Sequence, residues 1–208
     1  MGLSNYNNFS FDQTKRRPDD ILMNESRIIE NFLTTGSEES FGALFEGAYP
    51  RLRRYFLLRG IEEGEAEDLA QNVMVLVYRH REEVRAAESF YGWLFKVAKN
   101  ELARYWRQSR TRQRLAPMEQ LTDELADRLT IEMEWEGASN FTSWMDSLEP
   151  AERELILLRF VEGLSYEELA LALEIPLGTV KWRLFAVKKK LIPMIQESSS
   201  AKTRKRLH

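Results

Sequence analysis

The fold is decided between residues 163 and 191, which read GLSYEELALALEIPLGTVKWRLFAVKKKL. Ser165 and Glu168 have the spacing of a capping box, in which the hydroxyl and the carboxylate each accept a hydrogen bond from an unpaired amide at a helix start. This spacing predicts a short helix over residues 166–173. Residues 174–176 then form a turn that ends in proline, which is tolerated in the first turn of a following helix.

The helix that follows this turn has one buried face and one basic face. Val180, Leu184, Val187 and Leu191 recur at spacings of four, three and four residues, which places them in a single apolar stripe. At about 100° per residue, the remaining surface carries two aromatic side chains and four cations: Lys181, Trp182, Arg183, Phe185, Lys188 and Lys189. A short helix, a tight turn and a second helix with a basic outer face are typical of a helix-turn-helix, whose second helix enters the major groove.

The basic face has two interpretations, a DNA-binding surface and a merely solvated one. Lys and Arg side chains can neutralise phosphates and contact guanine edges, whereas the basic face of an ordinary helical hairpin would only be solvated. The capping box, the turn and the apolar stripe agree in register, which favours DNA binding. For Trp182 and Phe185 two interpretations stay open, namely contact with thymine methyl groups and contact with a protein partner.

A second basic helix is predicted over residues 90–108, with Ser89 as its N-cap. Its apolar stripe comprises Phe90, Leu94, Val97, Ala98 and Tyr105, and its opposite face presents Lys96, Lys99, Asn100, Trp106 and Arg107. Cations interleaved with a ring and an amide suit single-stranded nucleic acid, because charges follow the backbone while the ring or the amide engages an unstacked base. A solvated cationic face on a helical bundle is the alternative.

The chain of 208 residues is predicted to be all-α, with two small helical domains joined by a flexible acidic linker, because glycine and proline are sparse and no segment alternates as a strand does. The C-terminal domain is the helix-turn-helix. We expect a loose extension over residues 1–37, a helical domain over 38–115, the linker over 116–140, the helix-turn-helix domain over 141–195 and a basic disordered tail over 196–208. Within the first domain a long helix is expected from about Glu65 to His80.

The net charge of −3 hides two basic blocks in acidic surroundings. Residues 91–115 hold seven basic residues and one acidic residue, and residues 181–208 hold nine basic residues and one acidic residue. Each block coincides with one of the two basic helices. The distribution of charge therefore indicates local contact with a polyanion.

The composition argues against several classes of protein. The absence of cysteine removes disulfides, thiolate zinc sites and cysteine nucleophiles, and fits a reducing cytoplasm. We expect no metal site, because His80 lies about 18 Å of helix from Asp68 and no second histidine is nearby. No nucleophile–base pair or glycine-rich phosphate loop indicates an enzyme, so no catalytic residue and no cofactor is expected. No apolar run reaches the roughly 20 residues of a membrane span.

Five short strings, in this order and spacing, carry a resemblance to a known family. They are AEDLAQ at residues 66–71, WLFKVAKN at 93–100, LEPAER at 148–153, GLSYEELA at 163–170 and GTVKWRL at 178–184. The chain resembles bacterial RNA polymerase sigma factors of the extracytoplasmic-function (ECF) group over about residues 38–115 and 141–192. The resemblance implies a transcription initiation factor that binds core RNA polymerase, recognises the minus-thirty-five and minus-ten promoter elements and helps melt the promoter.

The resemblance also implies roles for individual residues. The positions that match the contact with core polymerase, at the coiled coil of its β′ subunit, are Asp68, Gln71, Asn72 and Arg79. The positions implied for the minus-ten element are Lys96, Lys99, Asn100, Arg104, Trp106 and Arg107. The positions implied for the minus-thirty-five element are Thr179, Lys181, Trp182, Arg183, Phe185, Lys188 and Lys189. The β flap of the polymerase and an anti-sigma protein are further implied partners.

Four positions depart from the family pattern. Asn72 stands where an acid is usual, which weakens the expected β′ contact, and Arg104 replaces a common Asp. Trp182 replaces Ser in the recognition helix, and Ala186 replaces a frequent basic residue. The last two departures bear on which promoter sequence is read.

Two other classes of protein are alternatives, a free-standing DNA-binding regulator and a nucleic-acid enzyme. A free-standing helix-turn-helix regulator would bind duplex DNA without a partner and with a steep salt dependence, yet acidic surroundings flank both basic blocks and repel DNA unless a partner masks them. A nucleic-acid enzyme would need clustered carboxylates or a nucleophile on a basic cleft, and the sequence offers neither.

Overall fold

The computed structural model describes residues 18–84, 86–108, 145 and 147–205. Every regular element within these ranges is helical, which confirms the all-α prediction. The elements in chain order are α1 (Pro18–Thr35), α2 (Glu38–Leu57), α3 (Glu63–Arg79), η1 (Arg81–Glu83), η2 (Ala87–Ser89), α4 (Phe90–Gln108), α7 (Pro150–Ile156), η4 (Leu157–Val161), α8 (Tyr166–Leu173) and α9 (Leu177–Lys205). The predicted linker over residues 116–140 lies outside the described ranges.

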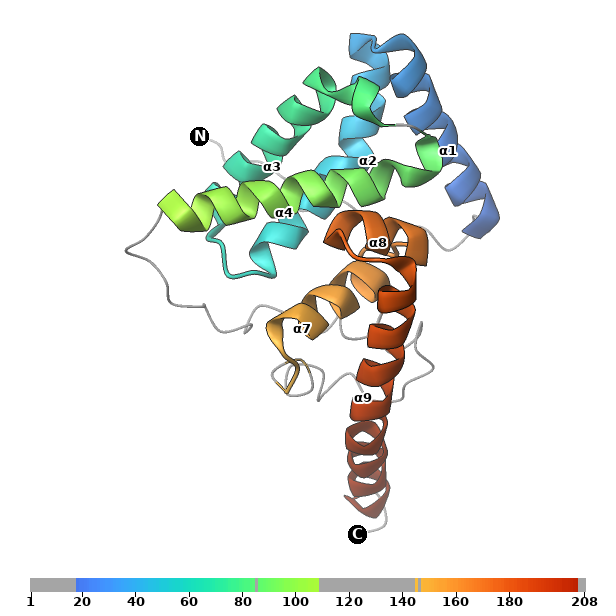
Figure 1. Cartoon of the computed structure of the whole chain (residues 1–208), viewed down its shortest axis with the longest axis vertical. Coiled ribbons are helices and arrows are strands. Elements are labelled where there is room, and N and C mark those ends of the chain that lie inside the picture. The colour runs from blue at the N-terminus through green and yellow to red at the C-terminus, as the bar shows by residue number, and fades with distance from the viewer. Residues whose placement is uncertain (1–17, 85, 109–144, 146, 206–208) are drawn as a thin grey trace, which may run out of the picture.

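The first half of the chain, α1–α4, has a core built from the apolar stripes of its helices. The residues that fill this core, all at most 4% exposed, include Leu44, Leu52, Phe56, Val73, Val77, Phe90, Leu94 and Ala98. They recur at helical spacing on α2, α3 and α4, so the three helices present their stripes to one another. Figure 1 shows these helices together in the upper part of the molecule.

The N-terminal segment differs from the expectation of a loose extension over residues 1–37. Residues Pro18–Thr35 form the helix α1, and Ile29 and Phe32 on it are 3% and 0% exposed. These two apolar side chains pack α1 onto the core, which offsets the conformational entropy lost when a polar segment becomes ordered. Ser37 then caps α2, because its hydroxyl accepts a hydrogen bond from the amide of Ser40 at 3.2 Å.

The helix-turn-helix follows the prediction in detail. The Ser165 hydroxyl accepts a hydrogen bond from the Glu168 amide at 3.1 Å, and the Glu168 carboxylate accepts one from the Ser165 amide at 2.8 Å, which confirms the capping box. The predicted stripe of α9 is buried at all four positions, Val180, Leu184, Val187 and Leu191.

The C-terminal end of α9 lies beyond its predicted position. Helix α9 continues through Pro193 to Lys205, where an end near residue 195 and a disordered tail over 196–208 were expected. Adding residues to a helix that already exists is far cheaper than nucleating one, so a polar segment can extend it. The Ser89 hydroxyl, predicted to cap α4, donates a hydrogen bond to the carbonyl of Ala86 at 2.9 Å within the short helix η2 that leads into α4.

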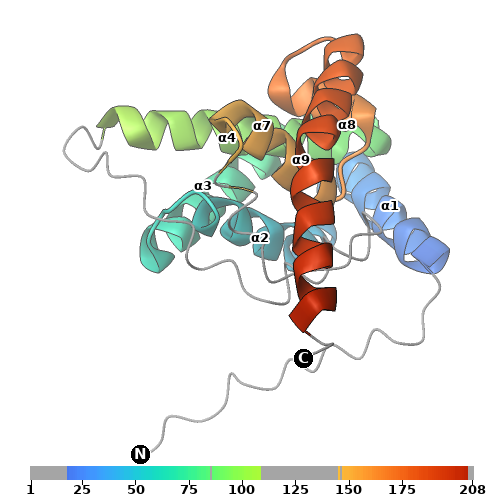
Figure 2. The ribbon, with the colours of Figure 1, turned by 90° about the horizontal axis from the view of Figure 1, so that it is seen from below.

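The second half of the chain, α7–α9, packs directly against the first half. The most extensive helix–helix contact among the described residues joins α4 to α8, and Figures 1 and 2 both show α8 lying beside α4. Helix α9 leads away from this contact, so that its C-terminal part projects from the molecule (Figure 1). The two predicted nucleic-acid helices, α4 and α9, are thus held in one body.

Candidate nucleic-acid interface

The outer face of α9 carries the side chains that the sequence predicted for duplex DNA. Lys181, Trp182, Phe185, Lys188 and Lys189 are exposed, whereas Thr179 and Arg183 are half-buried. The buried stripe on the other side of the helix fixes this orientation, since it docks α9 onto α7 and α8. The arrangement can present cations to phosphates along one side of a groove.

Two large aromatic side chains stand in the middle of this basic face. Trp182 is 68% exposed and Phe185 is 67% exposed, and they lie three residues apart, so they share one face of the helix. Two exposed large rings side by side form an apolar patch within an otherwise charged face. Both interpretations offered by the sequence, thymine methyl groups and a protein partner, are compatible with it.

The two central lysines of α4 are engaged by the other half of the molecule. Lys96 Nζ lies 3.0 Å from Glu174 Oε1, and Lys99 Nζ lies 3.6 Å from Glu174 Oε2. The hydrogen bond from Lys96 lowers the pKa of the Glu174 carboxyl below its ordinary value. The lysine positions predicted for single-stranded DNA face the turn of the helix-turn-helix.

The remaining predicted side chains of α4 lie toward its C-terminal end. Asn100, Arg104 and Arg107 are exposed, and Arg104 pairs with Glu101 at 2.5 Å. Trp106 is half-buried and meets the Tyr105 ring edge-on, with centroids 5.1 Å apart. This end of α4 keeps a basic and aromatic surface open to solvent.

Helix α3 presents a continuous exposed stripe on the side opposite the core. Asp68, Gln71, Asn72 and Arg79, the four positions predicted for core polymerase, are all exposed on it. The structure adds two residues to this stripe that were not predicted from the sequence. They are Val75, which is 47% exposed, and Tyr78, which is 41% exposed. The sequence pattern could have shown this, since Val75 lies three residues after Asn72 and Tyr78 lies seven residues after Gln71, so that both share the exposed face of the helix.

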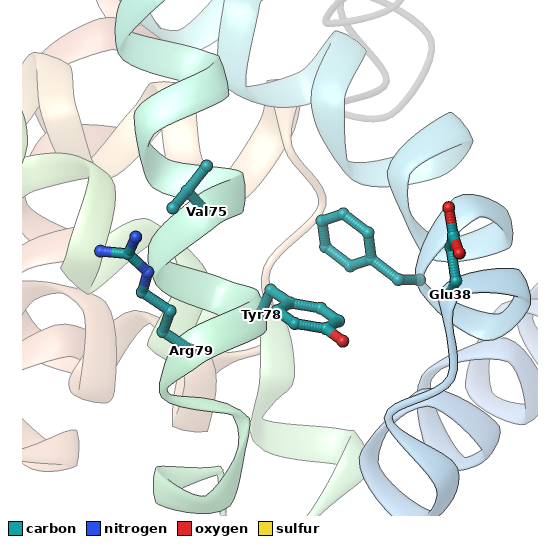
Figure 3. A pocket seen from close by; sticks show the side chains of 5 residues that line it. Glu38, Val75, Tyr78 and Arg79 are labelled. Atoms are coloured by element: carbon teal, nitrogen blue, oxygen red, sulfur yellow. The ribbon is translucent and has the colours of Figure 1, made fainter.

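This stripe borders a shallow groove between α2 and α3. The groove has a volume of about 540 Å³ and is lined by Glu38, Phe41, Val75, Tyr78 and Arg79. Figure 3 shows Tyr78 of α3 reaching toward α2, whose first turn carries Glu38. The Tyr78 ring packs edge-on against Phe41 with centroids 5.1 Å apart. An apolar floor with one carboxylate and one guanidinium at its rim suits a protein side chain more than a nucleotide.

The described residues hold no arrangement suited to metal chemistry. His80 Nδ1 lies 2.9 Å from a carboxylate oxygen of Glu83, and in the described ranges no three His, Asp or Glu side chains gather as a metal ion requires. None of the helices in the described part of the chain combines the length and apolarity needed to cross a bilayer.

Two family models match the two halves of the chain. The model described as Sigma-70 region 2 matches residues 44–112, and the model described as Sigma-70, region 4 matches residues 141–191. The chain belongs to the sigma-70 family. The region 2 match contains α4 with its basic face, and the region 4 match contains the helix-turn-helix and the basic part of α9.

Similar proteins place this sigma factor in the ECF group. It is 26% identical over 184 residues to the ECF RNA polymerase sigma-E factor of Escherichia coli (strain K12), covering 82% of this chain and 96% of that one. It is 31% identical over 157 residues to the RNA polymerase sigma-H factor of Pseudomonas aeruginosa, covering 64% of this chain and 77% of that one. The solved structure of CnrH in complex with the cytosolic domain of CnrY shares the fold, with a TM-score of 0.57, 19% identity and coverage of 83% and 97%.

The family decides between the hypotheses that the sequence left open. Because region 2 accompanies the helix-turn-helix of region 4, the chain is an ECF-type sigma factor and not a free-standing regulator. Sigma factors are transcription initiation factors that act with RNA polymerase. Membership of the family does not by itself assign a contact to any single residue.

Proposed function

We propose that this sigma factor divides its work among three surfaces. The outer face of α9 reads the minus-thirty-five element through Thr179, Lys181, Trp182, Arg183, Phe185, Lys188 and Lys189. The basic face of α4 captures the minus-ten element through Lys96, Lys99, Asn100, Arg104, Trp106 and Arg107. The exposed stripe of α3, with Asp68, Gln71, Asn72 and Arg79, docks on core polymerase. Residues 38–115 and 141–195 are the two working domains, and the cytoplasm, where transcription takes place, is the compartment.

The observation that carries this proposal is that α9 has one buried apolar face and one exposed basic face. Four apolar side chains at most 3% exposed lie on one side of it, and Lys181, Lys188 and Lys189 are exposed on the other. A helix fixed in this way can enter a major groove without losing its own packing. The exposed stripe of α3 supports the polymerase contact, because Val75 and Tyr78 add apolar area to its polar residues.

Run-off transcription with core polymerase tests the proposal. We expect this chain to support specific initiation from a library of promoter fragments, and sequencing of the transcripts then gives the two promoter elements. The isolated chain should bind the same duplexes poorly, because acidic surfaces flank its basic helices. If the chain neither associates with core polymerase nor supports initiation, the proposal is wrong.

Two double variants separate the surfaces and serve as controls for each other. Lys181→Ala with Lys188→Ala should weaken promoter binding by roughly tenfold and lower the salt dependence, since each lost phosphate contact removes a slope of about 0.9, while core binding is unchanged. Asp68→Ala with Gln71→Ala should weaken core binding and leave the DNA surface of α9 intact. If both variants act on the same step, the division between the surfaces is wrong.

We further propose that Trp182 and Phe185 are contact residues, either for promoter DNA or for an anti-sigma protein. Their exposed fractions of 68% and 67% support this, as does their position on one helical face. Replacing both with Ala should weaken promoter binding or an anti-sigma complex. If neither changes, the two rings have no role in either contact.

A further inference from the structure

Trp182 lies on the side of α9 that is farthest from the core. Val180 and Leu184, two residues before and after it, are 0% and 3% exposed, so at about 100° per residue the indole projects from the opposite side of the helix. Small residues lie one turn away in both directions, Gly178 and Ala186. A Cβ added at Gly178 would have no atom within 4 Å, so the space on that side of the indole is open to a ligand.

Trp182 also lies in the part of α9 that is suited to meet bases. In a helix-turn-helix the N-terminal residues of the second helix contact base edges, and Trp182 lies in the second turn of α9, which begins at Leu177. Lys181, which is exposed, and Arg183, which is half-buried, lie about 100° to either side of it. Both cations can contact phosphates, so the indole lies between two phosphate-binding positions.

The apolar patch around Trp182 is small and enclosed by cations. Its other member is Phe185, and Lys188 and Lys189 separate this pair of rings from Ile192, the next exposed apolar side chain in the described part of α9. The cores of protein–protein interfaces are depleted in charged residues. A DNA-reading face instead combines cations for the phosphates with isolated apolar contacts to bases. The surroundings of the indole therefore favour DNA over a protein partner.

The chemistry of the indole selects one base. Its side chain offers an apolar ring and a single N–H donor, and it has no hydrogen-bond acceptor. Thymine alone among the four bases presents a methyl group in the major groove, and its O4 atom beside that group is an acceptor. An indole placed over thymine can thus cover the methyl group, whereas cytosine offers only a donor that the indole cannot accept.

We infer that Trp182 is a specificity-determining residue, which reads the methyl group of a thymine in the minus-thirty-five element. The inference rests on the proposed function, in which α9 enters the major groove of that element. Because serine is usual at this position in the family, the thymine contact distinguishes the promoters of this chain from those of its relatives. The minus-thirty-five element that the holoenzyme selects should therefore contain an A·T pair at a fixed position.

Deoxyuridine substitution tests the methyl contact directly. Deoxyuridine pairs with adenine as thymidine does and differs from it only in lacking the methyl group. Holoenzyme assembled from the full chain and core polymerase is titrated onto promoter fragments from the run-off selection, in which dU replaces each dT of the minus-thirty-five element in turn, on both strands. At one position we expect the affinity of the unaltered holoenzyme to fall about fourfold, the effect of losing one buried methyl group.

Three variants test whether this effect belongs to the indole. Trp182→Ala should bind the dT promoter roughly tenfold more weakly and should bind the dU promoter no more weakly than that. Trp182→Phe keeps a ring and should keep the dependence on the methyl group. Lys188→Ala is the matched control, because loss of a phosphate contact should weaken binding to both promoters alike and leave their ratio near fourfold. Since the Trp182 ring is exposed, its removal leaves the core intact, which circular dichroism verifies.

Three outcomes would overturn the inference. The first is a Trp182→Ala chain that keeps the fourfold loss at every thymine position. The second is an unchanged promoter affinity of Trp182→Ala, which would assign the ring to a protein partner. The third is a selected minus-thirty-five element with no fixed A·T pair. Failure of the proposed function is distinct from all three, because then no promoter supports specific initiation by the unaltered chain.

Discussion

Tyr55 and Tyr91 show how individual side chains are tied into the molecule. The guanidinium of Arg59 lies 3.4 Å from the Tyr55 ring centroid, and that of Arg51 lies 4.1 Å from the Tyr91 ring centroid. Burial raises the pKa of both phenols far above the ordinary value of about 10, and neither ionises while the protein is folded. Each phenol hydroxyl donates a hydrogen bond to a carboxylate, Tyr55 to Glu154 and Tyr91 to Glu25.

The first prediction concerns the alkaline titration of these phenols. Because the folded state binds the two protons more tightly than the unfolded state, their contribution to stability is complete below about pH 10 and is lost as the pH rises above it. Tyrosinate absorbance should show that Tyr55 and Tyr91 ionise only when the chain unfolds. Tyr55→Phe should leave one late phenol. If Tyr55 and Tyr91 ionise near pH 10 with the helices intact, their buried hydrogen bonds are absent.

At the scale of whole elements, α1 is part of the core rather than an appendage to it. The Phe32 ring lies 5.7 Å from the Phe41 ring and 6.5 Å from the Tyr78 ring, centroid to centroid. Helix α1 therefore supports the groove between α2 and α3, which borders the stripe of α3 that we propose for core polymerase. Residues 18–35 mix polar and apolar side chains, so the segment gives a weak signal before its partner surface is known.

The second prediction is the effect of removing the Phe32 ring. Phe32→Ala should lower the free energy of unfolding by about 3–5 kcal/mol, the usual effect of truncating a buried aromatic residue. Urea unfolding followed by circular dichroism gives the value. Phe185→Ala is the control, because an exposed ring contributes within about 0.5 kcal/mol. A loss of less than about 1 kcal/mol for Phe32→Ala would show that α1 is only loosely attached.

On the scale of the whole molecule, buried ion pairs join the two halves. The Arg59 and Glu154 side chains are 10% and 21% exposed, and the Arg54 and Glu162 side chains are 31% and 2% exposed. Removing one partner of a buried pair leaves the other charge without compensation, which costs about 3–5 kcal/mol. The pair between His80 and Glu83, with side chains 50% and 61% exposed, is of the surface kind that contributes little.

The third prediction concerns the ion pairs that Glu154 and Glu162 form between the two halves. Glu154→Ala with Glu162→Ala should convert one cooperative urea transition into two, because the halves then unfold separately. With a slope of about 2 kcal/mol per molar urea, the less stable half should lose more than about 1 M in its midpoint. Glu83→Ala, which breaks only the exposed pair, should leave a single transition at the original midpoint. A single unshifted transition in the double variant would mean that the interface does not stabilise the fold.

The features that the sequence predicted correctly all depend on neighbours within one or two helical turns. Three such features are the capping box of Ser165 and Glu168, the stripe from Val180 to Leu191 and the exposure of Trp182. They follow from residue spacing along a helix, so they can be predicted before the packing partner is known. The predicted span of α4, residues 90–108, is also the observed one. The assignment of DNA and polymerase contacts to single residues stays a prediction.

By itself the sequence determined α3, α4, α8 and the buried stripe of α9, together with the family, because these depend on residues three and four positions apart, whereas α1 was not foreseen. The tertiary structure alone decided which faces meet. Lys96 and Glu174, like Gly92 and Glu168, are more than seventy residues apart, and no local pattern relates them. Their meeting depends on the packing of α8 onto α4, and the energy of that contact exists only once both helices are formed. The small net charge of −3 is thus composed of acidic and basic surfaces that the fold brings together.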